Sequence, residues 1–204
     1  MLSILLAAGW PIWPLLIASI VALALIIERV RSLRRGAIVP STLLPEVLTL
    51  VRKGPVPAEV ANKLEANSPL GRVLAAAVRN VNAPRDVMKE AIEETGAAVA
   101  HDLEKYLTTI GTIASAAPLM GLFGTVVGMI EIFGSQGGAA GSANPAQLAS
   151  GISIALYNTG FGLAIAIPTL IFYRHFRRLI DSYISEMQIQ AVRLVDVVHG
   201  SRQG

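Results

Sequence analysis

Residues 151–168 read GISIALYNTGFGLAIAIP. The stretch is apolar enough to lie in a bilayer, and it contains no Asp, Glu, Lys, Arg or His. Its first half still carries a polar cluster, made of Ser153, Tyr157, Asn158 and Thr159. Because polar groups in lipid need internal partners, we expect Ser153, Tyr157 and Asn158 to face neighbouring helices or a hydrated crevice.

The composition is that of a membrane protein. Hydrophobic residues make up 53% of the 204 residues, charged residues only 15%, and the mean hydropathy is +0.57. Soluble domains carry about 25% charged residues. The net charge of +3 follows from cytoplasmic Lys and Arg, and 5% aromatic residues argue against a base-stacking surface, so no nucleic acid is expected. The chain has no cysteine, which excludes disulfides and thiolate metal sites.

Three stretches are long enough to span the membrane, a length of roughly 20 residues. They cover about residues 9–28, 107–132 and 148–173. The Gly-rich segment 134–147 separates the second span from the third and is typical of a turn or loop. The predicted fold class is an all-α membrane protein with three transmembrane helices, the second and third extended into a cytoplasmic helical bundle.

Positive residues follow the first span and the third span, whereas the 134–147 loop is uncharged. The positive-inside rule therefore places the N-terminus outside and the C-terminus in the cytoplasm. The predicted regions are an outer N-terminus with the first span (1–30), a cytoplasmic helical region (31–106), the second span (107–132), a short outer loop (133–147), the third span (148–173) and a cytoplasmic C-terminal helix (174–204).

A cleavable signal peptide is the alternative for residues 1–27. Such peptides carry positive residues before their apolar core. Here the first positive residues come after it, from Arg29 onward. The order of charges favours a retained anchor, and Trp10 and Trp13 fit an aromatic anchor at the outer interface.

The cytoplasmic region is predicted to be helical. Ser68 is the expected N-cap of one helix, with Pro69 at its first position, and Pro84 begins another. No strong helix breaker occurs from Arg85 to Pro118, which predicts one helix running from the cytoplasm into the second span. After the third span, apolar residues spaced by 4 and 3 form a heptad-like seam. Its residues are Ile180, Ile184, Met187, Ala191, Leu194 and Val198, and the expected partners are Val87, Ala91, Thr95, Val99 and Leu103.

Small residues share one face of each of the last two spans, at intervals of 4 and 3. Such faces let helices approach closely in lipid. They are Ala117, Gly121, Gly124 and Gly128 in the second span, and Ala155, Gly162 and Ala166, with Thr159 among them, in the third. Packing alone would explain both faces. Thr125, Thr159 and Ser115 could in addition place hydroxyls along a hydrated path.

The segments APLMGLFGTVVGMIEIF (117–133) and GISIALYNTGFGLAIAIP (151–168) resemble the MotA/TolQ/ExbB proton-channel family, as does IIERVRSLR (26–34). Three spans and an outer N-terminus resemble its ExbB/TolQ branch more than the four-helix flagellar stators. The resemblance covers essentially the whole chain. It implies a bacterial inner-membrane pentamer whose second and third helices enclose a pore, with the outer loop and N-terminus in the periplasm.

The resemblance also implies partners. Within the pore lie the helices of an ExbD/TolR-like single-span protein with a membrane-embedded Asp, and a TonB- or TolA-like protein can follow. Proton flow through that Asp would power outer-membrane transport or envelope processes. The family's pore-facing threonines correspond to Thr125 and Thr159.

One position departs from the family pattern. ExbB and TolQ proteins commonly read GIxEAL in the third span, whereas this chain reads GISIAL with Ile154 in place of the Glu. Glu28 and Glu131 lie at span boundaries. Because proton relays in membranes use Asp, Glu or His, we expect the titrating group to come from the partner.

Other functional classes are weaker. The alternative function is a membrane scaffold that has kept the oligomer but lost proton coupling. Ile154, in place of the common Glu, would reflect that loss. His101, His175 and His199 stand apart without further ligands, so they are expected to be surface residues and no metal or other cofactor is predicted. We expect no enzyme, because the sequence contains no nucleophile–base set and no phosphate loop.

Overall fold

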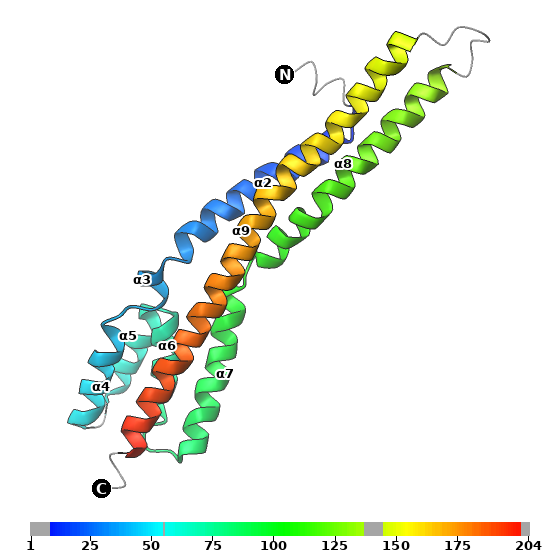
Figure 1. The fold of residues 1–204 in the computed structure, drawn as a ribbon. Helices are drawn as coiled ribbons and strands as arrows, with labels where there is room; N and C mark the ends of the chain where they lie inside the picture. The colour runs from blue at the N-terminus through cyan, green and yellow to red at the C-terminus, as the bar shows by residue number, and fades with distance from the viewer. Residues whose placement is uncertain (1–8, 55, 137–144, 201–204) are drawn as a thin grey trace. The chain divides into compact units, whose positions relative to one another are not determined.

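The computed structural model describes residues 9–54, 56–136 and 145–200. Three of its helices are long and apolar enough to cross a membrane, over Ile12–Ser32, Leu107–Gly134 and Ala149–Gly200. They confirm the predicted fold class, an all-α membrane protein with three transmembrane helices. The described elements are α2 (Ile12–Ser32), α3 (Arg35–Ile38), α4 (Leu43–Lys53), α5 (Ala58–Asn67), α6 (Pro69–Arg79), α7 (Arg85–Leu103), α8 (Leu107–Gln136) and α9 (Pro145–Gly200) (Figure 1).

The chain divides into two compact units. The membrane unit comprises the chain up to Glu28 together with Tyr106–His175, and the bundle unit comprises Arg29–Lys105 together with the chain from Phe176. Helix α9 contributes to both units. Most of the predicted loop over 134–147 lies outside the described residues, which end at Gln136 and resume at Pro145.

The membrane unit is built from α2, α8 and the first part of α9. Leu15 of α2, Ala117 of α8 and Ala166 of α9 form a small buried cluster where the three helices meet. Trp10 meets the ring of Phe123 edge to face, with 5.9 Å between the ring centroids. Large apolar side chains cover the outside of the unit, as a bilayer-embedded surface requires. Among them are Ile17, Ile20, Leu23, Leu119 and Ile171.

The bundle unit has α6 at its centre, in contact with α4, α5 and α7. Leu70 and Leu74 of α6 are fully buried. The Ser68 hydroxyl accepts a 3.1 Å hydrogen bond from the Gly71 N–H, and Pro69 opens the helix. The predicted cap is therefore confirmed, and it satisfies one of the backbone donors that a helix leaves open at its start.

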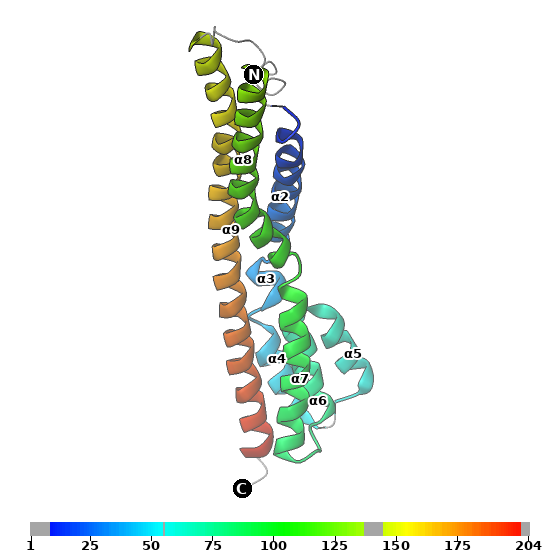
Figure 2. The same ribbon diagram turned by 90° about the vertical axis from the view of Figure 1, so that its right-hand side faces the viewer.

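Helix α7 lies beside the C-terminal half of α9 in both views (Figures 1 and 2). Ion pairs join the two helices at both ends, from Arg85 to Asp196 at 2.7 Å and from Arg177 to Glu104 at 4.0 Å. The α9 seam faces inward as predicted. Ile180, Met187, Ala191, Leu194 and Val198 are buried and Ile184 is half-buried.

Two further contacts hold the bundle unit together. The Tyr183 hydroxyl donates a 3.0 Å hydrogen bond to the Leu33 carbonyl, and burial raises the pKa of this phenol. Asp102 accepts a hydrogen bond from the Arg72 guanidinium, which lowers the pKa of the carboxyl. Tyr183 is 5% exposed, whereas Asp102 lies on the surface. The first contact therefore stabilises the unit more than the second, because exposed ion pairs contribute little.

The prediction of one helix from Arg85 into the second span is wrong. Helix α7 ends at Leu103 and α8 begins at Leu107. Between them Tyr106 has a φ of 66°, in the left-handed region of backbone conformation that residues other than Gly and Asn rarely adopt. A residue in this conformation cannot continue a right-handed helix. No Gly or Pro marks the break in the sequence, which is why the sequence pattern missed it.

The predicted partner face on α7 is also partly wrong. Val87 is 44% exposed, whereas the adjacent Met88 is fully buried together with Val99 and Leu103. The start of α7 offers two adjacent apolar positions, and packing selected the second. His101 and His175 are exposed as expected, but His199 is half-buried and its Nε2 atom is enclosed. Among the described residues, no group of His, Asp and Glu side chains could hold a metal ion.

Candidate functional site

The small-residue faces of α8 and α9 lie against each other in the membrane unit. A Cβ built on Gly162 would lie 2.6 Å from the Ala117 carbonyl oxygen and 3.1 Å from the Gly121 Cα. A Cβ on Gly121 would lie 2.7 Å from the Asn158 carbonyl oxygen. Real Cβ atoms essentially never approach other atoms to the two distances below 3.0 Å, and 3.1 Å is also unusually short. The two backbones therefore touch directly, as small residues allow in lipid.

The same contact continues toward the end of α8. A Cβ on Gly124 would lie 2.8 Å from the side chain of Asn158, and one on Gly128 would lie 3.1 Å from the Ala155 Cβ. Ala117, Ala155, Gly162 and Ala166 are all buried. The seven small residues singled out in the sequence thus lie along one helix–helix contact, except that Ala166 packs where α2 joins it.

The hydroxyls of α8 bond to their own helix. Thr125 Oγ1 donates to the Leu122 carbonyl at 2.6 Å, and Ser115 Oγ lies 3.0 Å from the carbonyls of Gly111 and Thr112. Such bonds occupy the hydroxyl proton. The oxygen lone pairs remain able to accept a hydrogen bond from water. Ser115 is exposed and Thr125 half-buried, so both oxygens can be reached.

Thr125 and Thr159 occupy different surroundings within one chain. Thr125 lines an open depression made of α8 residues, with Val126, Met129 and Phe133 among them. Thr159 is half-buried in the α8–α9 contact, and its Cα lies 3.0 Å from the Cβ position of Gly121. A pore lined by both threonines would need α8 and α9 faces from more than one copy.

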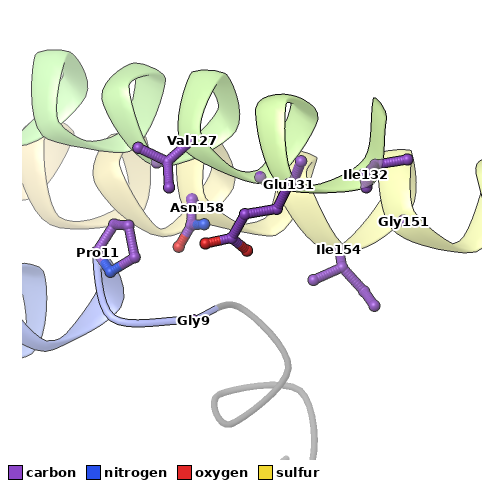
Figure 3. A pocket seen from close by; sticks show the side chains of 11 residues that line it. Gly9, Pro11, Val127, Glu131, Ile132, Gly151, Ile154 and Asn158 are labelled. Carbon is purple, nitrogen blue, oxygen red and sulfur yellow. The ribbon is translucent and has the colours of Figure 1, made fainter. Parts of the chain in front are cut away.

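A pocket of about 240 Å³ lies at the end of this contact, between α8, α9 and the residues that precede α2. Glu131 and Asn158 supply its polar side chains, and Figure 3 shows the Glu131 carboxylate directed toward the Asn158 amide. Asn158 is 1% exposed, whereas Glu131 is exposed. The pocket therefore joins an accessible acid to a buried amide. Its remaining lining residues are Gly9, Pro11, Gly124, Val127, Gly128, Ile132, Gly151, Ile154 and Ala155.

The polar cluster of the third span is divided by this arrangement. Of the three residues predicted to face a crevice or neighbouring helices, Asn158 lines the pocket. Ser153 is exposed and Tyr157 is 42% exposed, so both side chains lie on the outer surface of the chain and not in the pocket. Ile154 lines the same pocket (Figure 3).

Glu131 lines the pocket, whereas the sequence predicted only that it lies at the boundary of the second span. Helix α8 continues to Gln136, so Glu131 lies in its last two turns, near the end of the segment that is long and apolar enough to cross a membrane. The sequence contains a pattern that places Glu131 on the small-residue face of α8. The 4-3-4 spacing that leads from Ala117 to Gly128 reaches Glu131 after three further residues. The small-residue face of α8 thus ends in a carboxylate.

Comparison with known proteins shows the family to which the chain is related. The model of the MotA/TolQ/ExbB proton channel family matches residues 65–189, more than half of the chain. The chain is 35% identical over 174 residues to biopolymer transport protein ExbB-like 3 of a Synechocystis species, covering 85% of this chain and 83% of that protein. It is 42% identical over 88 residues to biopolymer transport protein ExbB of Helicobacter pylori, covering 43% of this chain and 60% of that protein.

A third relative also matches most of the chain. Biopolymer transport protein ExbB-like 1 of Synechocystis is 32% identical over 171 residues, covering 83% of this chain and 67% of that protein. The family model spans α6, α7, α8 and most of α9, so it includes part of the bundle unit and the α8–α9 contact. The chain belongs to the MotA/TolQ/ExbB proton channel family, in its ExbB/TolQ-like branch.

Proposed function

We propose that the chain is the proton-channel subunit of an ExbB–ExbD or TolQ–TolR type motor in a bacterial inner membrane. Five copies form a ring in which α8 and α9 enclose a pore. The pore holds the single helix of an ExbD/TolR-like partner that carries a membrane Asp. Proton motive force then drives outer-membrane transport or envelope processes, through a TonB- or TolA-like protein where one is present.

The observation that carries the proposal is the direct backbone contact between α8 and α9. Gly121 and Gly162 allow the two helices to pack as one stiff pair, because neither has a side chain to separate them. A pore-forming ring could use such a closely packed helix pair as its wall. The hydroxyl oxygens of Thr125, Thr159 and Ser115 would offer water a polar track along this wall.

The proposed orientation follows the distribution of positive residues. Arg174, Arg177 and Arg178 follow the third span, which favours a cytoplasmic C-terminus and a periplasmic N-terminus. The bundle unit would then lie in the cytoplasm and the connection between α8 and α9 in the periplasm. The region boundaries given above are proposed on the same basis.

Proton flux into vesicles tests the proposal. The chain is reconstituted alone, and together with an ExbD/TolR-like single-span protein that carries a membrane Asp, and a pH gradient is applied across the bilayer. We expect background flux for the chain alone and faster flux for the pair, because the partner supplies a membrane Asp. Fast flux through the chain alone, or none through the pair, would contradict the proposed mechanism.

A membrane scaffold without proton coupling is the second candidate. Ile154 favours it, since an aliphatic side chain stands where the family commonly has a carboxylate. The same experiment separates the two. A stable complex with the partner that conducts no protons supports the scaffold, whereas conduction supports the motor.

A further inference from the structure

We propose that Glu131 is a proton-accepting group of the transmembrane path. It would receive its proton in the pocket between α8, α9 and the residues that precede α2. The inference deepens the proposed function and rests on it. The proton path would then contain Glu131 of this chain in addition to the partner's Asp. Under the proposed orientation Glu131 lies at the periplasmic end of α8, which is the side from which protons enter.

The position of Glu131 on α8 is the first argument. It continues the face of Ala117, Gly121, Gly124 and Gly128, which lies against α9. A charged side chain on that face of an apolar helix is costly, so acids within membrane helices are expected to have a functional reason. The carboxylate is directed into the pocket (Figure 3).

The composition of the pocket is the second argument. Of the described residues that line it, Glu131 alone is titratable. The segment before α2 contributes Gly9 and Pro11, and α9 contributes apolar groups and the Asn158 amide. None of the described residues that line the pocket is a cation.

Asn158 gives the pocket a way to accommodate both states of the acid. Its side chain is 1% exposed and faces the carboxylate (Figure 3). An amide carries both a donor and an acceptor. It can donate to the carboxylate when Glu131 is charged and accept from the carboxyl O–H when Glu131 is protonated.

The pocket is also large enough for water. Its volume is about 240 Å³, whereas one water molecule takes about 30 Å³ in the liquid. Because Glu131 is exposed and Asn158 is buried, water could bring a proton from outside to the acid. The transfer is a single protonation of a carboxylate and requires no co-reactant. Release toward the partner's Asp regenerates the charged form.

Carbodiimide labelling tests the acid in the chain alone, without the partner. Dicyclohexylcarbodiimide reacts with protonated carboxyls in apolar surroundings. We expect Glu131 to be labelled in vesicles, with more labelling at lower pH, and the exposed Glu90 of the bundle unit to be labelled much less. Equal labelling of both residues would show that Glu131 is an ordinary water-exposed acid and would overturn the inference.

Flux measurements with the partner test the role in conduction, in buffer free of sodium. We expect Glu131→Gln to slow proton flux at least about tenfold and Glu90→Gln to leave it unchanged. Ile154 lines the same pocket, so Ile154→Glu in the Glu131→Gln background should restore much of the flux. Restored flux would also exclude misfolding as the cause of the loss.

The outcomes separate the two levels of the proposal. Wild-type flux in Glu131→Gln would overturn the role of Glu131 and leave the proposed motor intact. Absence of flux in the wild-type pair would overturn both. Flux that requires added sodium would also overturn the inference, since the pocket would then serve a metal cation.

Discussion

Gly121 and Gly162 meet so closely that a Cβ on Gly162 would lie 3.1 Å from the Gly121 Cα. Both residues are buried in the contact between α8 and α9. In a bilayer no hydrophobic effect brings two helices together, so close packing has to supply the attraction. This pair therefore marks a point where the membrane unit is sensitive to added volume.

A single added methyl group tests this contact. We expect Gly162→Ala to destabilise the chain by about 1–3 kcal/mol, the usual cost of overpacking, because its Cβ would approach the Ala117 carbonyl oxygen. Thermal unfolding in detergent measures the change. Gly160→Ala is the matched control, since nothing lies within 4 Å of a Cβ at that position of the same helix. Equal midpoints for the two variants would contradict the tight contact.

The Thr159 hydroxyl can be separated from the packing of its side chain. Thr159→Val keeps the branched shape and removes one hydrogen-bonding group. If that group lines the path, losing about 1 kcal/mol of hydrogen bonding should slow proton flux of the complex about fivefold. Ser150→Ala, which alters an exposed hydroxyl on the same helix, should have a smaller effect. Equal and mild effects would favour packing over a pathway.

The C-terminal seam of α9 should carry much of the stability of the bundle unit. Leu194 is fully buried, so Leu194→Ala should cost about 2–5 kcal/mol through lost contacts and a residual cavity. Val192 lies two residues away and is 54% exposed. Val192→Ala should change stability by less than about 0.5 kcal/mol. Denaturation followed by circular dichroism measures both, and a large loss for Val192→Ala would place an unseen partner on that face.

The Tyr183 hydrogen bond makes a prediction about pH. Tyr183→Phe leaves the buried Leu33 carbonyl without its donor and should cost about 1–2 kcal/mol at neutral pH. Burial raises the folded-state pKa of Tyr183 above its usual 10.0. The stabilisation is therefore complete below pH 10 and is lost as the pH rises through the higher folded value.

The stability difference between wild type and Tyr183→Phe measures this pH dependence. It should be constant from pH 6 to 9 and shrink in strongly alkaline buffer. Lys63→Gln, at an exposed position of the same unit, serves as a control for general alkaline effects. A difference that grows with pH above 10 would have the wrong sign for a buried neutral phenol.

Much of the membrane unit could be predicted from local pattern. Long apolar stretches determine the three spans, because a bilayer accepts helices of that length with few charges. The 4-3-4 spacing of small residues determined which faces of α8 and α9 are available for close approach. Ser68 and Pro69 likewise determined the start of α6, since capping depends on neighbouring residues alone.

Tertiary structure decided the features that depend on residues far apart in the chain. The sequence offers both Val87 and Met88 for the inner face of α7, and only packing in the bundle unit chose Met88. Tyr106 interrupts the helix between Leu103 and Leu107 without a Gly or Pro to mark it. A left-handed residue of this kind persists only where its surroundings compensate for the strain.

The pocket shows the same division most clearly. The sequence by itself determined that GISIALYNTGFGLAIAIP carries no titratable group and that Glu131 ends the small-residue face of α8. It did not determine that Glu131 and Asn158, 27 positions apart, would face one cavity with Ile154 in its wall. That meeting depends on the register in which α8 packs against α9, and glycine contacts between two distant segments set this register.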